Sequence, residues 1–373
     1  MLYDMRILLT GGFTGGHLFP LVAVSKKIRE KIGDEAEFLY VGTGAKIEKE
    51  VMKAENIPTK YILAGKVRRY FSPLNFLDFF KIPVGFVQAL WILLSFMPDV
   101  VFSKGGYVSF PVVMVAWIYG IPIIIHESDA IPGTSNKILE KFSTRVAVAY
   151  PSAQKFFESS KTALLGNPVR EGINQGSKEE ARKIFNFTES KPVILVLGGS
   201  QGSEVVNEAI IRVLPRLIQH CQIIHQTGEN NYEKVVRGAG EQGLKAGHDG
   251  YFATGFLDFE LIKQAYALAD LVISRAGANI ISEIAANAKP NILIPLQNSA
   301  QNHQKMNAYS LAEVGGTLVL EESNLGENIF FEKIEKILFN EELKKEMSEK
   351  ISAFYHPKAA EHIAEGLIEL GSE

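Results

Sequence analysis

Cysteine is almost absent from this chain, because Cys221 is the only one among 373 residues. A single cysteine excludes an intrachain disulfide framework and a cysteine-rich metal site. It stands in the apolar run "CQIIH", so we expect it in a buried strand. The chain also has little excess of either charge: 39 Lys and Arg stand against 42 Asp and Glu, for a formal net charge of −3. That balance gives no case for nucleic-acid binding.

Long hydrophobic runs are missing as well. The start of the chain has an apolar run too short for a signal peptide. The most apolar segment, 82–97, is short for a membrane span and is interrupted by Pro83, Gly85 and Gln88. Basic and aromatic residues precede it, a pattern that favours a helix lying on an anionic membrane over a helix buried in the first domain. The residues expected at this membrane surface are Lys66, Arg68, Arg69, Phe79, Phe80 and Trp91.

The familiar nucleotide-binding fingerprints are incomplete in "GGFTGGH", residues 11–17. The Rossmann pattern fails because Phe13 stands where a second glycine is needed, and the P-loop pattern fails because His17 and Leu18 replace its Lys and Ser/Thr. What remains is a strand-to-helix turn with open backbone amides, which can hold a phosphate or a sugar. His17 can supply proton chemistry. The alternative is a tight turn in which His17 only caps a helix.

Short apolar runs alternate with helix-period segments along the whole chain, which predicts an α/β fold with doubly wound parallel sheets. The expected strands are 6–9, 37–41, 99–103, 122–126 and 145–149, then 192–198, 222–227, 251–254, 270–274, 291–295 and 316–320. The series restarts near residue 192, after a polar linker at 166–176. We therefore predict two Rossmann-like domains, 1–166 and 167–341, facing across a cleft that holds the site.

The second glycine-rich turn, "LGGSQGS", is the stronger phosphate candidate. Gly198 and Gly199 allow close approach of backbone to a ligand, and Ser200, Gln201 and Gly202 would begin a helix that runs to about residue 218. Free amides and the helix dipole favour an anion there. The alternative is a plain turn with Ser200 as the N-cap.

Polar side chains follow other strands of the second half. Glu283 lies about two turns into a helix among small apolar residues, which argues against a solvated face. A glutamate there can accept two hydrogen bonds from ribose hydroxyls. His303, Gln304 and Asn307 are uncharged hydrogen-bonding groups of the kind that bind sugar hydroxyls.

In the first half, "SKGGYVSFP" and "IHESDAIPGTSNK" both follow strands. Glu127 and His17 are candidate general bases on the same side of the site, whereas His126 fits a structural role better. No pair of carboxylates resembles a metal cage and no D-x-D occurs, so we expect no metal.

These motifs together resemble the MurG family of peptidoglycan glycosyltransferases. The resemblance runs from "GGFTGGHLFP" through "GGYVSFP", "HESDAIPGTSNK", "GNPVR", "LGGSQGS", "HQTGE", "SRAGANIISEIA" and "HQKMNA" to "HPKAAEHIAEGL". It implies a B-type glycosyltransferase (GT-B) fold in which a C-terminal helix, about 342–373, returns to the first domain. It also implies an enzyme peripheral to the cytoplasmic face of the bacterial inner membrane.

The resemblance further implies the substrates and partners. UDP-N-acetylglucosamine (UDP-GlcNAc) would be the donor, and the acceptor would be lipid I, undecaprenyl-diphosphate-linked MurNAc-pentapeptide. Inverting transfer to the C4 hydroxyl of MurNAc would give lipid II, with His17 as the favoured base, Glu127 second, and no cofactor. Other proteins of cell-wall synthesis are candidate partners.

By this resemblance, site residues fall into two sets. Phe256 and Leu257 would hold the uracil and Glu283 the ribose. The other donor-binding residues would be Thr14, Gly15, Asp129, Arg170, Ser200, Gln201, Gly202, Ala278, His303 and Gln304. The acceptor side would include Gly16, Tyr107 and Asn136.

Three departures from the family pattern stand out. Phe13 replaces a glycine, Asp129 replaces an amide that could donate a hydrogen bond, and Asn302 stands where an aspartate is common. Two other functions stay open: a UDP-GlcNAc 2-epimerase and a non-catalytic UDP-sugar-binding protein.

Overall fold

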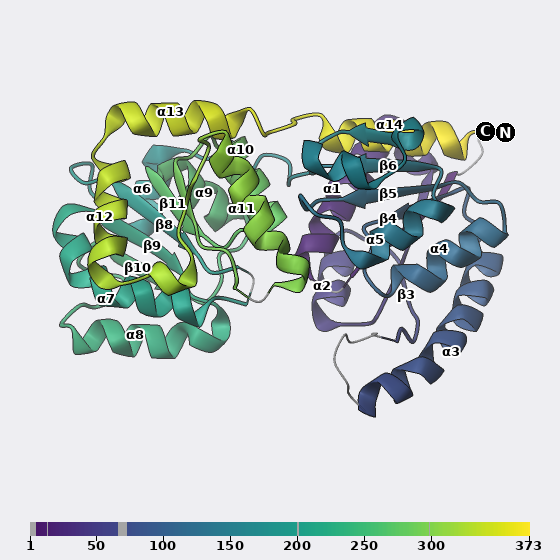
Figure 1. The fold of residues 1–373 in the computed structure, drawn as a ribbon, viewed down its shortest axis with the longest axis horizontal. Coiled ribbons are helices and arrows are strands. Elements are labelled where there is room, and N and C mark those ends of the chain that lie inside the picture. The colour runs from purple at the N-terminus through teal and green to yellow at the C-terminus, as the bar shows by residue number, and fades with distance from the viewer. Residues whose placement is uncertain (1–4, 13, 66–72, 200, 298) are drawn as a thin grey trace. The chain divides into compact units, whose positions relative to one another are not determined.

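The chain forms two compact units in the computed structural model, which describes residues 5–12, 14–65, 73–199, 201–297 and 299–373 (Figure 1). Unit 1 comprises 1–170 and 356–373, and unit 2 comprises 171–355. Each unit is built on one parallel sheet with helices between the strands. The predicted α/β class with two parallel sheets is confirmed.

Unit 1 has a seven-stranded sheet in the order β3-β2-β1-β4-β5-β6-β7. Its strands are β1 (Met5–Thr10), β2 (Ala36–Gly42), β3 (Thr59–Tyr61), β4 (Val100–Ser103), β5 (Ile123–Glu127), β6 (Arg145–Val148) and β7 (Thr162–Leu164). The central strands are buried along their length, as expected for parallel strands covered on both faces. Because β1, β4 and β5 are parallel neighbours, the loops that follow them all lie at the carboxyl ends of the strands, on the same end of the sheet.

The helices of unit 1 are α1 (Gly15–Ile32), α2 (Lys46–Ala54), α3 (Pro73–Phe96), α4 (Ser109–Ile118), α5 (Thr134–Leu139) and α14 (Ala359–Gly371). The C-terminal helix α14 lies beside α1, and Ile363 and Leu367 join a core that includes Ile7 and Leu9 of β1 (Figure 1). α3 lies beside α4.

Unit 2 has a six-stranded sheet in the order β10-β9-β8-β11-β12-β13. Its strands are β8 (Val193–Leu197), β9 (Gln222–Gln226), β10 (Tyr251–Thr254), β11 (Leu271–Ser274), β12 (Asn291–Leu293) and β13 (Leu318–Val319). Its helices are α6 (Lys178–Phe185), α7 (Glu204–His220), α8 (Tyr232–Glu241), α9 (Phe259–Leu268), α10 (Ala278–Ala286), α11 (His303–Glu313), α12 (Glu327–Leu338) and α13 (Glu341–Ser352). The core joins the sheet to α7, α8, α12 and α13.

The division of the chain differs in detail from the boundaries expected from the sequence. Residues 167–170 belong to unit 1, where the guanidinium of Arg170 lies 5.0 Å from the centre of the Phe19 ring. The segment expected as one helix over about 342–373 is two helices. α13 stays in unit 2 because Met347 packs into that core, and only α14 joins unit 1.

Candidate functional site

The loop after β1 places His17 in the first turn of α1. The amides of His17 and Leu18 donate to the carbonyl of Thr14 at 2.9 and 3.2 Å, and Thr14 Oγ1 lies 3.0 Å from His17 Nδ1. When Nδ1 donates to that hydroxyl, Nε2 carries the lone pair that a general base needs. Phe13 lies outside the described residues.

Close backbone contacts join the loops after β1 and β4. A β-carbon on Gly12 would lie 2.9 Å from His17 Nδ1, and one on Gly106 would lie 3.1 Å from the Gly12 nitrogen. Gly106 also has a φ of +90°, a conformation that favours glycine. The half-buried Tyr107, expected on the acceptor side, directly follows Gly106 in this loop. Gly15 and Gly16 are the first two residues of α1.

Glu127 holds the loop after β5 together. Its buried carboxylate accepts hydrogen bonds from the Asp129 amide at 2.9 Å, the Gly133 amide at 3.0 Å and Asn136 Nδ2 at 3.0 Å. Burial, followed by the charge of Asp129, raises the pKa of Glu127. Because three donors already engage this carboxylate, its geometry fits a positioning role better than that of a base.

Lys104, which sequence reasoning did not single out, is buried directly after β4. Its Nζ lies 2.5 Å from His126 Nδ1, and His126 Nε2 donates to the carbonyl of Gly166 at 2.9 Å. Burial, and then the charge of Lys104, holds the pKa of His126 well below its usual range. His126 is therefore a neutral, structural histidine, as expected. The available signal for Lys104 was a charged residue at the end of an apolar strand.

Tyr40 and Glu48 form a second buried pair that sequence reasoning missed. The Tyr40 hydroxyl lies 3.1 Å from Glu48 Oε1 and 3.3 Å from the carbonyl of Gly11. Glu48 also accepts hydrogen bonds from the amides of Thr43 and Gly44. Burial and the neighbouring Glu48 raise the pKa of Tyr40. This pair therefore helps to hold the loop after β1, through the hydrogen bond from Tyr40 to the carbonyl of Gly11.

In unit 2, the glycine-rich turn after β8 differs from the sequence prediction in where the helix begins. Ser203 is the N-cap of α7, and its hydroxyl accepts from the Val206 amide at 3.3 Å. Ser200 lies outside the described residues, and the exposed Gln201 precedes the helix in the turn. Gly202 has a φ of +77°, and a β-carbon there would lie 2.0 Å from the carbonyl of Thr227. The backbone of this turn is thus in close contact with the loop after β9.

Gln226, at the end of β9, links two loops of the expected donor site. Its Nε2 donates to the carbonyl of Gly199 at 3.1 Å, and its Oε1 accepts from the amide of Leu257 at 3.1 Å. Leu257 is buried, and Phe256 beside it is 46% exposed. Sequence reasoning missed Gln226, although it ends a predicted strand at the same edge as Gly199.

Glu283 is buried on α10, as its apolar neighbours predicted. Its Oε2 accepts from the Tyr266 hydroxyl at 3.3 Å. Ala278, expected at the sugar, is the first residue of the same helix. Its carbonyl accepts from the hydroxyl of Ser282 at 2.8 Å.

The start of α11 carries the remaining donor-side candidates. Gln304 Oε1 accepts from the amide of Leu296 at 3.1 Å, and the half-buried His303 precedes it. Asn307 is fully buried and donates to the carbonyl of Ala276 at 3.2 Å, so it fixes the turn before α10.

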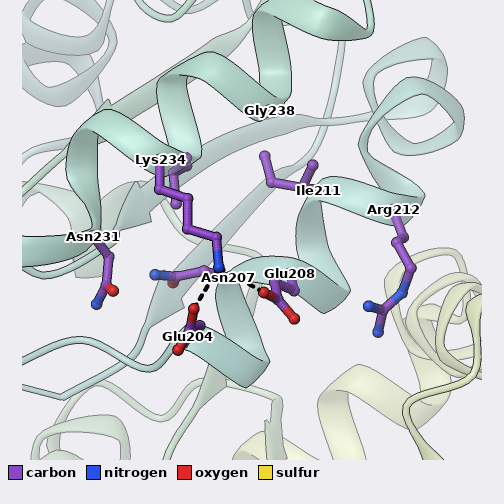
Figure 2. A pocket seen from close by; sticks show the side chains of 9 residues that line it. Glu204, Asn207, Glu208, Ile211, Arg212, Asn231, Lys234 and Gly238 are labelled. Carbon is purple, nitrogen blue, oxygen red and sulfur yellow. Dashed lines mark hydrogen bonds and ion pairs between the residues drawn. The ribbon is translucent and has the colours of Figure 1, made fainter.

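A groove between α7 and α8 is lined by none of the site residues predicted from the sequence (Figure 2). Lys234 on one side pairs with Glu204 and with Glu208 on the other, the latter at 2.8 Å. The apolar side chains that line it are Ile211 and Val235. Within the described residues there is no group of three or more His, Cys, Asp or Glu side chains able to hold a metal ion.

The expected membrane residues are described only in part. Lys66, Arg68 and Arg69 lie outside the described residues, as do the side chains of Phe79 and Phe80. Trp91 is 69% exposed on α3. In the part of the chain that the structure covers, no helix has the length and apolar character needed to cross a bilayer.

Comparison with known proteins identifies the family. The profile of the glycosyltransferase family 28 N-terminal domain matches residues 7–148, and that of the C-terminal domain matches 193–363. A relative from Clostridium perfringens (strain ATCC 13124), named UDP-N-acetylglucosamine–N-acetylmuramyl-(pentapeptide) pyrophosphoryl-undecaprenol N-acetylglucosamine transferase, is 40% identical over 338 residues, covering 90% of this chain and 91% of the relative. A relative of the same name from Thermodesulfovibrio yellowstonii is 38% identical and covers 97% of both chains.

Solved structures agree with this assignment. The crystal structure of Acinetobacter baumannii MurG matches with a TM-score of 0.75 at 25% identity, covering 98% of this chain and 99% of that one. UDP-GlcNAc 2-epimerase from Neisseria meningitidis, bound to UDP-GlcNAc, has a TM-score of 0.71 at 13% identity, covering 98% of this chain and 100% of that one, a likeness of fold alone. This chain therefore belongs to glycosyltransferase family 28 and, within it, to the MurG family.

Proposed function

We propose that this protein transfers N-acetylglucosamine from UDP-GlcNAc to the C4 hydroxyl of MurNAc in lipid I, which gives lipid II for peptidoglycan synthesis. The observation that carries the proposal is the 40% identity over nine-tenths of both chains to transferases named for this reaction. The match to both domains of family 28 supports it, because donor and acceptor chemistry then come from one chain.

The reaction proposed is a single displacement with inversion. The C4 oxygen of the acceptor forms a bond to the anomeric carbon as the bond to the UDP phosphate oxygen breaks, and His17 takes the hydroxyl proton. The position of His17 in a glycine-lined turn, with Nδ1 beside Thr14, supports this role. General base catalysis of this kind contributes about 10²–10⁴-fold.

The leaving UDP gains negative charge, which backbone amides at the start of α7 would stabilise. The turn at Gly199–Gly202, held by Gln226, supports this assignment. Glu283 would accept hydrogen bonds from the ribose, and Arg170 would supply a cation for the diphosphate. On this mechanism the transfer needs no metal.

The direct test is to incubate the purified protein with radiolabelled UDP-GlcNAc and lipid I, with and without EDTA. We expect label in lipid II at the same rate in both. Release of free N-acetylmannosamine would instead support an epimerase, and donor binding without turnover would support a non-catalytic protein. No label in lipid II would overturn the proposed transfer, and loss of transfer with EDTA would overturn only the metal-free mechanism.

We further propose that α3 holds the protein on the cytoplasmic face of the membrane. Val84, Val87, Trp91 and Leu94 recur at helical spacing and are 46–69% exposed, which forms an apolar stripe (the α3 stripe) on one helix face. The basic cluster Lys66, Arg68 and Arg69 precedes α3 in the sequence. Apolar insertion and attraction to anionic lipid together give stable interfacial binding.

Vesicle flotation tests this contact. Trp91→Ser with Leu94→Ser should weaken binding to all vesicles, and charge reversal at the basic cluster should weaken binding to anionic vesicles only. Ile329→Ser, which changes an exposed apolar residue of α12, is the matched control. Unchanged binding of both variants would show that another surface makes the contact.

A further inference from the structure

A buried cluster of charged groups lies at the carboxyl ends of β4 and β5. Lys104 is only 3% exposed, and Glu127 is 4% exposed. The charges of Glu127 and Asp129 both act on Lys104, and the charge of Lys104 acts in turn on Glu127. The side chains of Lys104, Glu127 and Asp129 therefore form one group of interacting charges, with a single amine among two carboxyl groups.

The geometry around Lys104 gives it two sets of contacts. Its amide donates to the carbonyl of Thr10 at 2.9 Å, and a β-carbon on Gly11 would lie 3.3 Å from the β-carbon of Lys104 and 3.4 Å from that of His17. The stem of the lysine thus lies next to the turn that carries His17. Its Nζ, at the other end, reaches His126 on β5.

The hydrogen bonds of His126 define which nitrogen is protonated. Nε2 faces the carbonyl of Gly166 and must donate, so Nδ1 is an acceptor and Lys104 is the donor. The carbonyl of His126 then accepts from Asn136 Nδ2, which also donates to Glu127. Lys104 is thereby connected to the loop after β5 through His126, whose ring accepts from Lys104 and whose carbonyl accepts from Asn136.

We propose that Lys104 is a positioning residue for the transfer reaction, whose ammonium group balances the carboxylates of Glu127 and Asp129 and keeps the loop after β5 ordered. The inference rests on the proposed function. It also accounts for Asp129, which stands where the MurG pattern has an amide: a buried cation next to the loop makes a carboxylate acceptable there.

The consequence for pH follows from the state of Glu127. As a carboxylate it accepts three hydrogen bonds, and protonation removes part of that capacity. Burial lowers the pKa of Lys104 to about 8, while both carboxylates oppose this shift. Other titratable groups border the cluster: His126 itself, His17 across Gly11, Tyr150 beyond Asp129, and His356 beyond Gly166.

The test compares pH profiles of kcat/KM for Lys104→Met, Asp129→Asn and the double variant. Lys104→Met should move the acidic limb upward by about one pH unit or more, because an opposite charge near Glu127 is lost. In the double variant the acidic limb should move most of the way back to its wild-type position, because the like charge of Asp129 is also removed. Lys53→Met, on the exposed side of α2, is the matched control.

An unmoved acidic limb in Lys104→Met, or a double variant shifted as far as Lys104→Met, would overturn the proposal. A second measurement needs no activity or variant: NMR of histidine-labelled wild-type protein should show His126 as the neutral Nε2–H tautomer from pH 5 to 8. The Nδ1–H tautomer or an imidazolium would contradict the proposed contact. Failure of transfer by the wild-type protein would bear on the proposed function alone.

Discussion

His17 and Glu127 have different surroundings, so replacing each should have different effects. His17→Ala removes the proposed base, and we expect kcat to fall about 10²–10⁴-fold with little change in UDP-GlcNAc affinity or melting temperature. Glu127→Gln leaves one acceptor oxygen for three donors, so a buried donor loses its partner at a cost of about 1–3 kcal/mol. It should therefore lower the melting temperature as well as the rate.

Kinetics and thermal melting of both variants check this prediction. If His17→Ala kept near-normal turnover while Glu127→Gln lost activity without loss of stability, Glu127 would be the base.

His225 gives unit 2 a pH-dependent stability. Tyr251 donates to its Nδ1 and Nε2 donates to Asn207 Oδ1, both at 3.0 Å, and burial lowers its pKa to about 3. Since the unfolded histidine titrates near 6.5, the unfolded state binds the proton first. The stability that neutral His225 contributes should be complete above pH 6.5. Below that pH, the free energy of unfolding should fall by up to about 1.4 kcal/mol per pH unit towards pH 3.

Denaturant unfolding between pH 7 and 4 measures this slope. His225→Gln should be less stable at pH 7 but lose stability less steeply, whereas the exposed His248→Gln should follow the wild-type slope. Equal slopes for wild type and His225→Gln would exclude His225 as the source.

The surroundings of a polar residue could be predicted where it ends an apolar strand or interrupts a small-residue helix. The burial of Glu283 and the structural role of His126 were predicted on that basis. Lys104 and Gln226 were missed because their hydrogen-bond partners follow or belong to other strands, and which strands pair cannot be predicted from the neighbouring residues in the sequence. Long-range hydrogen bonds of this kind appear only once the sheet order is known.

At the level of elements, Gln226 connects the turn after β8 to the loop after β10. Gln226→Glu keeps an acceptor for the Leu257 amide but places a carboxylate against the carbonyl of Gly199. We expect UDP affinity to fall about tenfold, the equivalent of one lost hydrogen bond of roughly 1.4 kcal/mol. Calorimetric titration with UDP measures this.

Gln242→Glu makes the same chemical change at an exposed position after α8 and is the control. Unchanged UDP affinity in Gln226→Glu would mean that the two loops hold their positions without this side chain.

Elements with a strong apolar run could be predicted from the sequence, and weak ones could not. The eleven strands expected from apolar runs all occur, within a few residues of their predicted ends. β3 and β7 were missed because they are three-residue edge strands with little apolar character. The apolar segment 82–97 is only part of α3, which begins at Pro73 and contains Pro83.

At the scale of the whole molecule, unit 1 is made of two separate pieces of chain. α14 returns after unit 2 and buries Ile363, Leu367 and Leu370 in a core with β1, β4 and α1. Ion pairs such as that of Lys31 with Glu365, at 2.8 Å, lie on the exposed side of α14, but exposed ion pairs contribute little to the free energy of unfolding. The apolar face of α14 therefore carries the stability that it adds to unit 1.

Leu367→Ala tests this dependence, because the side chain is fully buried in α14. The substitution should cost about 2–5 kcal/mol of unfolding free energy, through lost burial and the cavity left behind. Ile329→Ala, at a half-exposed position of α12, should change it by less than about 0.5 kcal/mol. Calorimetry with saturating UDP distinguishes the two units, because most of the proposed nucleotide contacts lie in unit 2 and the nucleotide should raise the transition of that unit more than that of unit 1. Leu367→Ala should therefore lower the transition that UDP raises less. A loss no larger than that of Ile329→Ala would show that unit 1 is stable without the buried face of α14.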